Sequence, residues 1–151
     1  MPQASARSRP RSAARLAAVQ ALYQQEMEKT PLPMLLHEFH HHRLGATIEE
    51  VEYADAEVDF FDDVVSGVHA RAAEIDALIA KKLAKDWSPD RLDKPMRQIL
   101  RAGAYELLAR IDVPTASVIS EYVDVAKAFY DRREAAFVNG LLDAIAKEVR
   151  R

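Results

Sequence analysis

Four arginines stand close together near the start of the chain, and residues 1–15 contain no acid: Arg7, Arg9, Arg11 and Arg15. A guanidinium group presents N–H donors in a fixed fork that fits phosphate oxygens, and its plane can stack on an unpaired nucleobase. These residues therefore indicate a contact with nucleic acid. The other interpretation is a disordered solubilising tail, and composition leaves both open.

A second group that could do chemistry is a run of histidines, His37, His40, His41 and His42. His37 and His41 are four residues apart, so on a helix they could share a metal ion with an oxygen ligand from Glu38 or Glu49. Structural metal sites need four firm ligands, however, and histidines on a short polar helix are commonly solvated. We therefore predict no metal site.

Other catalytic signatures are missing from the sequence. The glycines are too far apart for a dinucleotide-binding or phosphate-binding loop: Gly45, Gly67, Gly103 and Gly140. The acids concentrated in residues 49–63, where no base occurs, are typical of a solvated helix face that would repel nucleic acid. Nucleotide enzymes that depend on such glycine loops are therefore excluded, and the sequence contains no cofactor motif.

Composition places the chain among helical proteins of one domain. It has 151 residues, of which 49% are hydrophobic, with no cysteine, four glycines, seven prolines and a formal net charge of −3. No apolar run approaches the roughly 20 residues that span a bilayer, and the N-terminus lacks the hydrophobic stretch of a secretory signal. We expect a soluble, cytoplasmic protein without a membrane partner.

Hydrophobic spacing predicts seven helices and no strand. The expected segments are 12–28, 34–42, a long helix from 53, a shorter one over 75–83, one from 93 that stops at 112–114, 115–130, and one from 131. Ser12, Asp93 and Asp131 are predicted caps, and Glu134 would complete a capping box with Asp131. Residues 1–11 are too polar to pack and are predicted to be a flexible arm, with a single helical domain over 12–151.

The first predicted helix has two different faces. Its large apolar residues form the predicted buried stripe: Leu16, Val19, Leu22, Tyr23 and Met27. Ala14, Ala18 and Ala21 lie on the opposite side, where small side chains would allow a backbone, an RNA or a second copy of the chain to approach. Gly67, inside the long helix, is a predicted close helix crossing.

Four ordered blocks of sequence match motifs of one known protein family. Residues 11–23 resemble its R-x-x-A-R-x-x-A-V-Q-A-L-Y helix, and residues 99–107 its L-R-x-A-x-Y-E-L helix. Residues 112–129 resemble D-V-P…I-x-E-x-x-x-x-A-K-x-F, and residues 137–143 resemble F-V-N-G-V-L-D. The chain therefore resembles the NusB family of bacterial antitermination factors, which implies a protein that catalyses no reaction. The likeness is weakest between residues 29 and 92.

The resemblance implies an all-helical bundle of two three-helix subdomains packed across each other, with the first helix bridging them. It also implies binding to the boxA element of ribosomal RNA leader transcripts together with the ribosomal protein NusE. NusA, NusG and RNA polymerase would complete the assembly that suppresses termination. The chain would be a monomer or a homodimer.

The resemblance also implies site residues. Arg11 and Arg15 match arginines of the family's RNA-binding N-terminus, and Phe137 matches a phenylalanine beside the RNA path. Gln20 and Tyr23 match the motif, but Tyr23 falls in the predicted buried stripe and is expected to be structural. Asn139 could hold a loop or helix start as readily as RNA.

The turn before the last helix departs from the family pattern. Many relatives have a G-A-E-D-S-like sequence where this chain has residues 130–134, so Arg132 and Arg133 are candidate phosphate contacts or are simply solvated. Met96, Arg97 and Tyr105 are the candidate NusE contacts. Two alternatives stay open: a homo-oligomeric interaction module without sequence-specific RNA binding, and the RNA-binding domain of an RNA methyltransferase.

Overall fold

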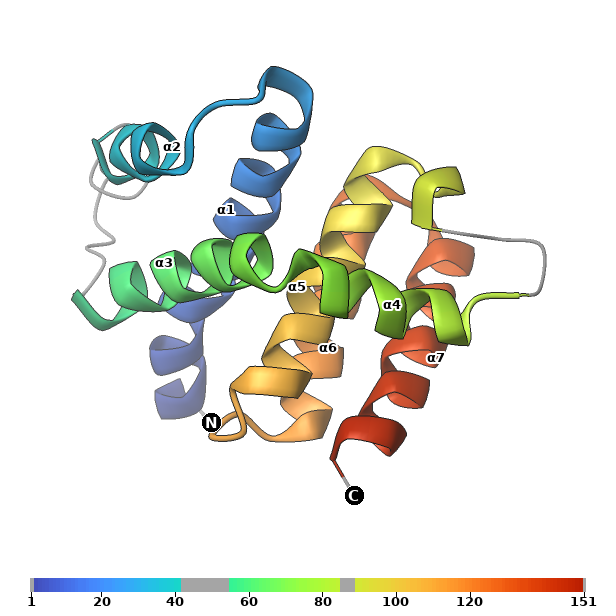
Figure 1. Ribbon diagram of the computed structural model, residues 1–151. Helices are drawn as coiled ribbons and strands as arrows, with labels where there is room; N and C mark the ends of the chain where they lie inside the picture. Colours follow the sequence, from blue (N-terminus) through green and yellow to red (C-terminus); the bar gives the residue numbers. More distant parts are fainter. Residues whose placement is uncertain (1, 42–54, 85–88, 151) are drawn as a thin grey trace. The chain divides into compact units, whose positions relative to one another are not determined.

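The computed structural model describes residues 2–41, 55–84 and 89–150, which form helices and no strand (Figure 1). The α-helices are α1 (Pro2–Glu28), α2 (Leu32–Phe39), α3 (Asp55–Ala70), α4 (Ala72–Lys82), α5 (Lys94–Ala109), α6 (Thr115–Phe129) and α7 (Arg132–Val149), and a 3-10 turn, η2, spans Pro89–Arg91. The all-α prediction with seven α-helices is confirmed over these residues, and residues 44–52, for which no helix is predicted, lie outside them. None of the described helices is both long and apolar enough to cross a membrane.

The chain divides into two compact units, Met1–Ser66 and Gly67–Arg151. The boundary falls inside α3, so its first part belongs to unit 1 and its last turn to unit 2. The prediction that residues 12–151 form one domain behind a flexible arm stays a prediction.

The core of unit 1 is aromatic. Phe39 of α2 and Phe61 of α3 are fully buried, and their rings stack with centroids 5.6 Å apart. His40 and Asp62 add a polar link between the same segments, with Nε2 and Oδ1 2.6 Å apart. This link and the stacked rings hold the end of α2 against α3.

The first helix differs from its prediction in its start and in its buried face. It begins at Pro2, so Ser12 lies inside it and does not begin it. Val19 and Leu22 are buried as predicted, but Tyr23 and Met27 are exposed to 38% and 50%. The alanine face is buried instead, at Ala14, Ala18 and Ala21. The prediction places the large apolar residues on the buried face. Alanines are buried where a neighbouring element approaches the helix closely, and the spacing of large residues does not reveal this.

Helix α1 ends where the sequence turns to proline, as predicted. Lys29, the residue after the helix, has φ of 58°, which is the left-handed conformation common after a helix C-terminus. Its N–H still donates to the carbonyl of Gln25 at 2.8 Å. Pro31 then precedes α2, where the fixed φ of proline suits a helix start.

In unit 2, α5, α6 and α7 pack against one another, and α4 contacts α5 and α7 (Figure 1). The inner face of α5 is buried throughout: Met96, Ile99, Leu100, Gly103 and Leu107. Asp93 caps α5 as predicted, since its carboxylate accepts from the N–H of Met96 at 3.4 Å. On α6, Ile119, Tyr122 and Ala126 are buried, whereas Phe129 is 41% exposed.

Gly67 is a point of close approach, as its place in a helical pattern predicted. A Cβ built on Gly67 would lie 2.2 Å from Cζ of Tyr105, so the tyrosine ring rests directly on the backbone of α3. Tyr105 is buried there, with 6% of its surface exposed. One helical turn after Gly67, at Arg71, the predicted long helix breaks and α4 begins.

The C-terminal end of α5 is held by polar contacts. Arg150, the cap residue of α7, donates to the carbonyls of Leu107 (2.8 Å), Glu106 (3.0 Å) and Arg110 (2.8 Å). Its other donors reach the carbonyl of Val113 at 2.7 Å and Oγ1 of Thr115 at 3.1 Å. These contacts satisfy carbonyls at a helix end and place a cation at its negative pole.

Three ion pairs and a buried hydrogen bond link the helices of unit 2. The Tyr122 hydroxyl donates to the Glu106 carboxylate at 2.5 Å, and both side chains are fully buried. Arg101 of α5 makes two bonds of 2.8 Å to the carboxylate of Asp76 on α4. Glu148 of α7 contacts both Lys81 (2.6 Å) and Lys82 (3.0 Å) of α4.

Replacing Arg150 by Met should lower the free energy of unfolding by about 2–4 kcal/mol, because half-buried carbonyls at the end of α5 lose a charged donor. Urea denaturation measures the change. Arg71→Met is the matched control, since Arg71 makes an exposed pair with Glu74 and should cost no more than about 0.5 kcal/mol. Equal losses in the two variants would contradict the role given to Arg150.

The pH dependence of stability should contain a contribution from Glu148. Hydrogen bonds from Lys81 and then Lys82 lower the pKa of Glu148 from 4.5 to about 2. A depressed pKa stabilises the folded state above the unfolded value, so this contribution should disappear as the pH falls from 4.5 through about 2. The stability difference between wild type and Glu148→Gln should therefore be full at about pH 7 and vanish below about pH 2. A difference that does not change over this range in urea titrations would refute the assignment.

Candidate nucleic-acid interface

The first candidate surface is the α1 basic face, which we define as Arg11 and Arg15. Both guanidinium groups lie over one aromatic ring of α3, with Cζ of Arg11 4.3 Å and Cζ of Arg15 4.8 Å from the centroid of Phe60. The spacing of four residues brings both side chains to the same side of α1. The electron-rich face of Phe60 attracts both cations.

The members of this face differ in access to solvent. Arg15 is buried, with 3% of its surface exposed, whereas Arg11 is only half-buried. Of the two, Arg11 is therefore the one that a ligand in solvent can reach in this conformation, and Arg15 packs around Phe60. Gln20 is half-buried further along α1. Arg7 and Arg9 lie in the first turns of α1, and their side chains are outside the described residues.

The second candidate surface is the α7 patch, which we define as Arg132, Arg133, Phe137 and Asn139. All four side chains are exposed, and 39% of the surface of Phe137 is accessible. Arg133 and Phe137 are neighbours at helical spacing, and Arg132 and Asn139 lie two turns apart on an adjacent row. A phosphate-binding fork and an aromatic face thus occur together at the start of α7.

The connection that leads into the α7 patch is tethered to α5. The Tyr130 hydroxyl donates to Oδ1 of Asp93 at 2.6 Å, the same carboxylate that caps α5. Partial burial raises the pKa of the Tyr130 hydroxyl, and its hydrogen bond to the negative Asp93 raises the pKa further. The tyrosine therefore keeps its proton, and the hydrogen bond holds the turn before Arg132 and Arg133.

The start of α7 is favourable for an anion. Asp131 is its N-cap residue, but its side chain caps no backbone N–H, so the capping-box prediction was wrong in this respect. A helix start presents N–H groups without a partner inside the helix, and the helix dipole is positive there. Arg132 and Arg133 add two positive charges to the same turn, while Glu134 opposes them.

The three candidate NusE contacts are less accessible than expected. Met96 is 4% exposed on the inner face of α5, and Tyr105 lies against Gly67. Arg97 donates to the carbonyls of Asp90 at 3.2 Å and Leu92 at 3.1 Å, so it fastens the turn before α5. Their contact with a partner protein stays a prediction.

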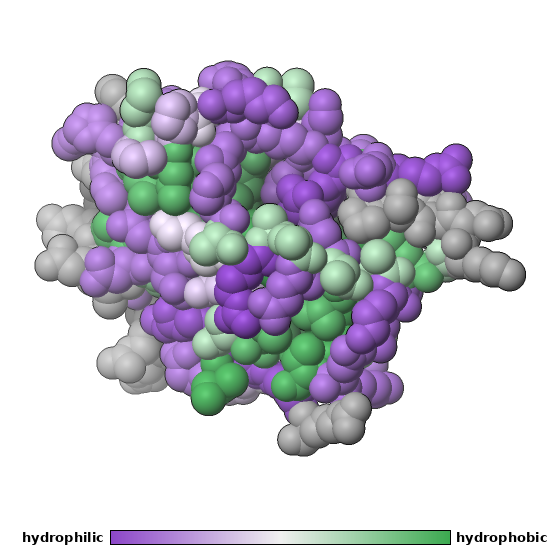
Figure 2. Space-filling view, viewed as in Figure 1, coloured by the Kyte–Doolittle hydropathy of each residue, from purple (hydrophilic) through white to green (hydrophobic). Residues whose placement is uncertain are grey.

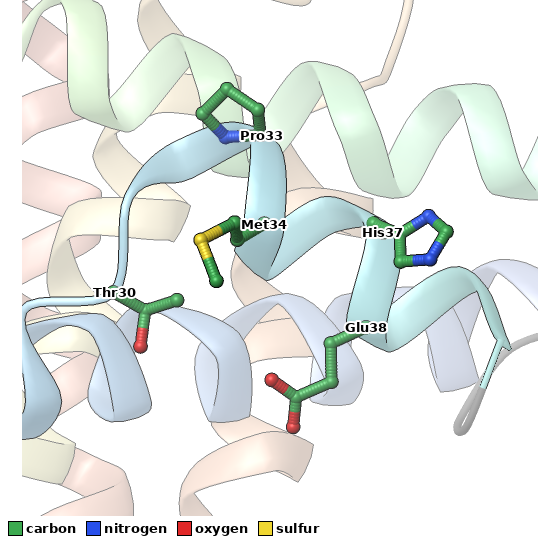
Figure 3. A pocket seen from close by; sticks show the side chains of 5 residues that line it. All are labelled: Thr30, Pro33, Met34, His37 and Glu38. Carbon is green, nitrogen blue, oxygen red and sulfur yellow. The ribbon is translucent and has the colours of Figure 1, made fainter.

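His37 lines an open pocket of about 360 Å³ on unit 1 (Figure 3). Its lining residues are Thr30, Pro33, Met34, His37 and Glu38. The rings of His37 and His41 meet edge to face at 4.2 Å, and Glu38 accepts a hydrogen bond from Gln24 at 3.1 Å. The described part of the chain holds no group of three side chains placed to share a metal ion, and His42 and Glu49 fall outside it.

Exposed apolar side chains are scattered over both units. The face in Figure 2 is largely hydrophilic, with hydrophobic areas between the charged ones. The large apolar side chains that are exposed among the described residues are Tyr23, Met27, Met34, Ile111, Phe129 and Phe137. Of these, Phe137 stands at helical spacing from an exposed arginine in the α7 patch, which suits an aromatic that stacks on a base.

Sequence reasoning missed three residues that shape these surfaces. Phe60 adjoins Phe61 in the sequence, and the pair was a signal that α3 has apolar contacts on two sides. The Tyr130 tether to Asp93 and the Arg150 contacts join residues 35 to 44 positions apart. The local sequence around each residue does not predict a contact with a residue so far away in the chain.

The fold and its surfaces define an all-helical protein whose exposed arginines and aromatic side chains suit contact with a polyanion. The model of the NusB family matches residues 12–147. The transcription antitermination protein NusB of Sphingopyxis alaskensis is 68% identical over 145 residues, covering 96% of this chain and 97% of that protein. The protein of the same name from Caulobacter vibrioides is 49% identical over 144 residues, covering 95% of this chain and 97% of its own length.

Solved structures agree with this relation. T. maritima NusB has a TM-score of 0.79 at 32% identity, covering 93% of both chains. A crystal structure of the antitermination factors NusB and NusE in complex with double-stranded RNA contains a chain with a TM-score of 0.78 at 29% identity, covering 93% of this chain and 98% of that one. The chain belongs to the NusB family.

Proposed function

We propose that this chain is a transcription antitermination factor that binds the boxA element of ribosomal RNA leader transcripts together with NusE. It acts in the cytoplasm without catalysing a reaction and joins NusA, NusG and RNA polymerase in the complex that suppresses termination. Support comes from the similarity of the chain to transcription antitermination proteins NusB and to the NusB chain of a solved complex with NusE and double-stranded RNA. Its own surfaces add physical support.

The observation that carries the proposal is the pairing of charge and aromatic surface on the α7 patch. Arg132 and Arg133 present phosphate donors at the positive end of a helix dipole, and the exposed ring of Phe137 lies one turn further on. Single-stranded RNA offers both complements, a phosphate backbone and unpaired bases that stack on aromatic rings. Arg11 adds a phosphate contact from α1.

Charge explains why a second protein is part of the proposal. The chain has a net charge of −3, so its long-range field does not attract RNA and its binding depends on local arginines. A partner such as NusE adds contact surface and charge to the same RNA. Met96, Arg97 and Tyr105 stay our candidate residues for that partner, with a rearrangement needed at the two buried ones.

The direct test is binding to boxA RNA and to a scrambled RNA of the same composition, with and without NusE. We expect tighter binding to boxA, and a further gain with NusE, because base stacking and a second protein surface add to the phosphate contacts. Fluorescence anisotropy measures both affinities at several salt concentrations. Equal affinity for the two RNAs in both conditions would sink the proposal.

Variants of the α7 patch should separate charge from stacking. Arg132→Ala together with Arg133→Ala should flatten the dependence of log affinity on log salt by about 0.7 for each phosphate that these arginines no longer neutralise. Phe137→Ala should weaken boxA binding roughly 5- to 150-fold with the slope unchanged, because a ring that stacks on a base carries no charge.

Arg71→Ala is the control for these variants, since it removes an exposed arginine that is paired with Glu74. It should change neither the affinity nor the slope by more than the measurement error. If it reduces the slope as much as the α7 double variant does, the arginines act as general charge and the α7 patch has no special role.

A further inference from the structure

We propose that Phe60 is a positioning residue for RNA binding. Its ring holds the guanidinium groups of Arg11 and Arg15 by cation–π contacts, so that Arg11 meets the RNA backbone already ordered and with its charge intact. The inference rests on the proposed function, and it assigns a role to a buried side chain that does not itself touch RNA.

The contact geometry supports this role. Phe60 is 2% exposed, yet the Cζ atoms of Arg11 and Arg15 lie only 4.3 and 4.8 Å from its ring centroid. The next residue, Phe61, has a different environment, because its ring stacks on Phe39 and lies 6.2 Å from the ring of His40. One ring of the pair therefore builds the core towards α2, while the other faces the arginines of α1.

An aromatic ring holds an arginine in a way that suits a later ligand. The ring covers the flat face of the guanidinium, whereas the N–H donors point outward in the guanidinium plane. A carboxylate would instead occupy those donors and neutralise the charge that RNA recognises. The ring of Phe60, whose centroid lies 4.3 Å from Cζ of Arg11, therefore restrains this guanidinium without neutralising its charge.

The ring of Phe60 also offsets an electrostatic repulsion between Arg11 and Arg15 of α1. Two like charges four residues apart on a helix repel each other, and Arg11 and Arg15 have this spacing. The electron-rich face of Phe60 attracts both, so it offsets that repulsion. Asp62, two residues after Phe60, is directed elsewhere, since its Oδ1 is 2.6 Å from Nε2 of His40.

Burial assigns the two arginines different tasks. Arg15 is 3% exposed and anchors the arrangement beneath the surface, while Arg11 is half-buried and can extend its donors to solvent. A long arginine side chain loses rotamer freedom when it is fixed on a ligand. Because contact with Phe60 has already restricted Arg11, less of that cost falls on RNA binding.

The test compares Phe60→Leu with Phe61→Leu in the full chain. Both variants replace a buried phenylalanine of α3 by the same smaller apolar side chain, so both should lose stability in urea denaturation. Only Phe60→Leu should weaken boxA binding, by roughly 2- to 30-fold, and flatten the salt dependence. Should Phe60→Leu fail to fold, Phe60→Met is closer to the original volume and carries the same comparison.

A double-variant cycle adds a readout that a merely structural role would not move. Arg11→Ala should weaken binding and lower the salt slope by about 0.7. In the Arg11→Ala background, Phe60→Leu should have little further effect on RNA affinity, because the group that the ring positions is already gone. Phe61→Leu should have the same negligible effect in either background.

The outcomes separate the two levels of the proposal. If Arg11→Ala weakens binding but Phe60→Leu binds as tightly as the wild type, or no more weakly than Phe61→Leu, the positioning role of Phe60 is overturned and the function stands. If the wild type itself does not distinguish boxA from scrambled RNA, the proposed function fails. If the wild type prefers boxA but Arg11→Ala binds boxA as tightly as the wild type, the RNA role of the α1 basic face is overturned. The positioning role of Phe60 is then overturned too.

Discussion

The carbonyl groups at the C-terminal end of α5 have no partners inside the helix and need hydrogen-bond donors from elsewhere. The contacts that supply these donors join α5 to the other helices of unit 2. Glu106 is the centre of this arrangement, because its backbone carbonyl accepts from Arg150 while its buried carboxylate accepts from Tyr122. A residue of α5 is thereby bonded to both α6 and the end of α7. Arg150 also reaches Val113 in the turn that leads to α6. The last residues of the chain thus secure the turn between two helices that come well before them in the sequence.

The arginines of this protein differ in function because their partners differ. Arg150 and Arg101 direct their donors to carbonyls and to a carboxylate, so they join helices and have little left for a ligand. The guanidinium of Arg11 instead lies against the face of an aromatic ring. Arg132 and Arg133 are exposed at a helix start. A net-acidic chain can therefore keep a few arginines for a polyanion while others act as structural crosslinks.

The sequence predicted the helices of unit 2 well, because strong local signals mark them. Asp93 starts α5, and Pro114 separates α5 from α6, as expected from caps and proline chemistry. The first helix was predicted less well, since the burial of Ala14 and the exposure of Tyr23 depend on how closely neighbours approach, which residue size does not reveal. The candidate site was anticipated in its residue types, but the resemblance to a family supplied Phe137. The tether of Tyr130 and the ring beneath Arg11 are pairings between distant positions, and no local pattern encodes them.

Because of the contact between Gly67 and Tyr105, the side chain that fits at one position depends on the residue at the other. The ring lies where any side chain at 67 would have to be, so neither position can change freely while the other keeps its present residue. A side chain at 67 would require the Tyr105 ring to move or to be replaced by a smaller residue. Helix α3 contains the boundary between the units, and the residue just past that boundary is this glycine. A smaller residue in place of Tyr105 opens the space that a side chain at 67 needs, so the effects of the two substitutions on stability should not be additive.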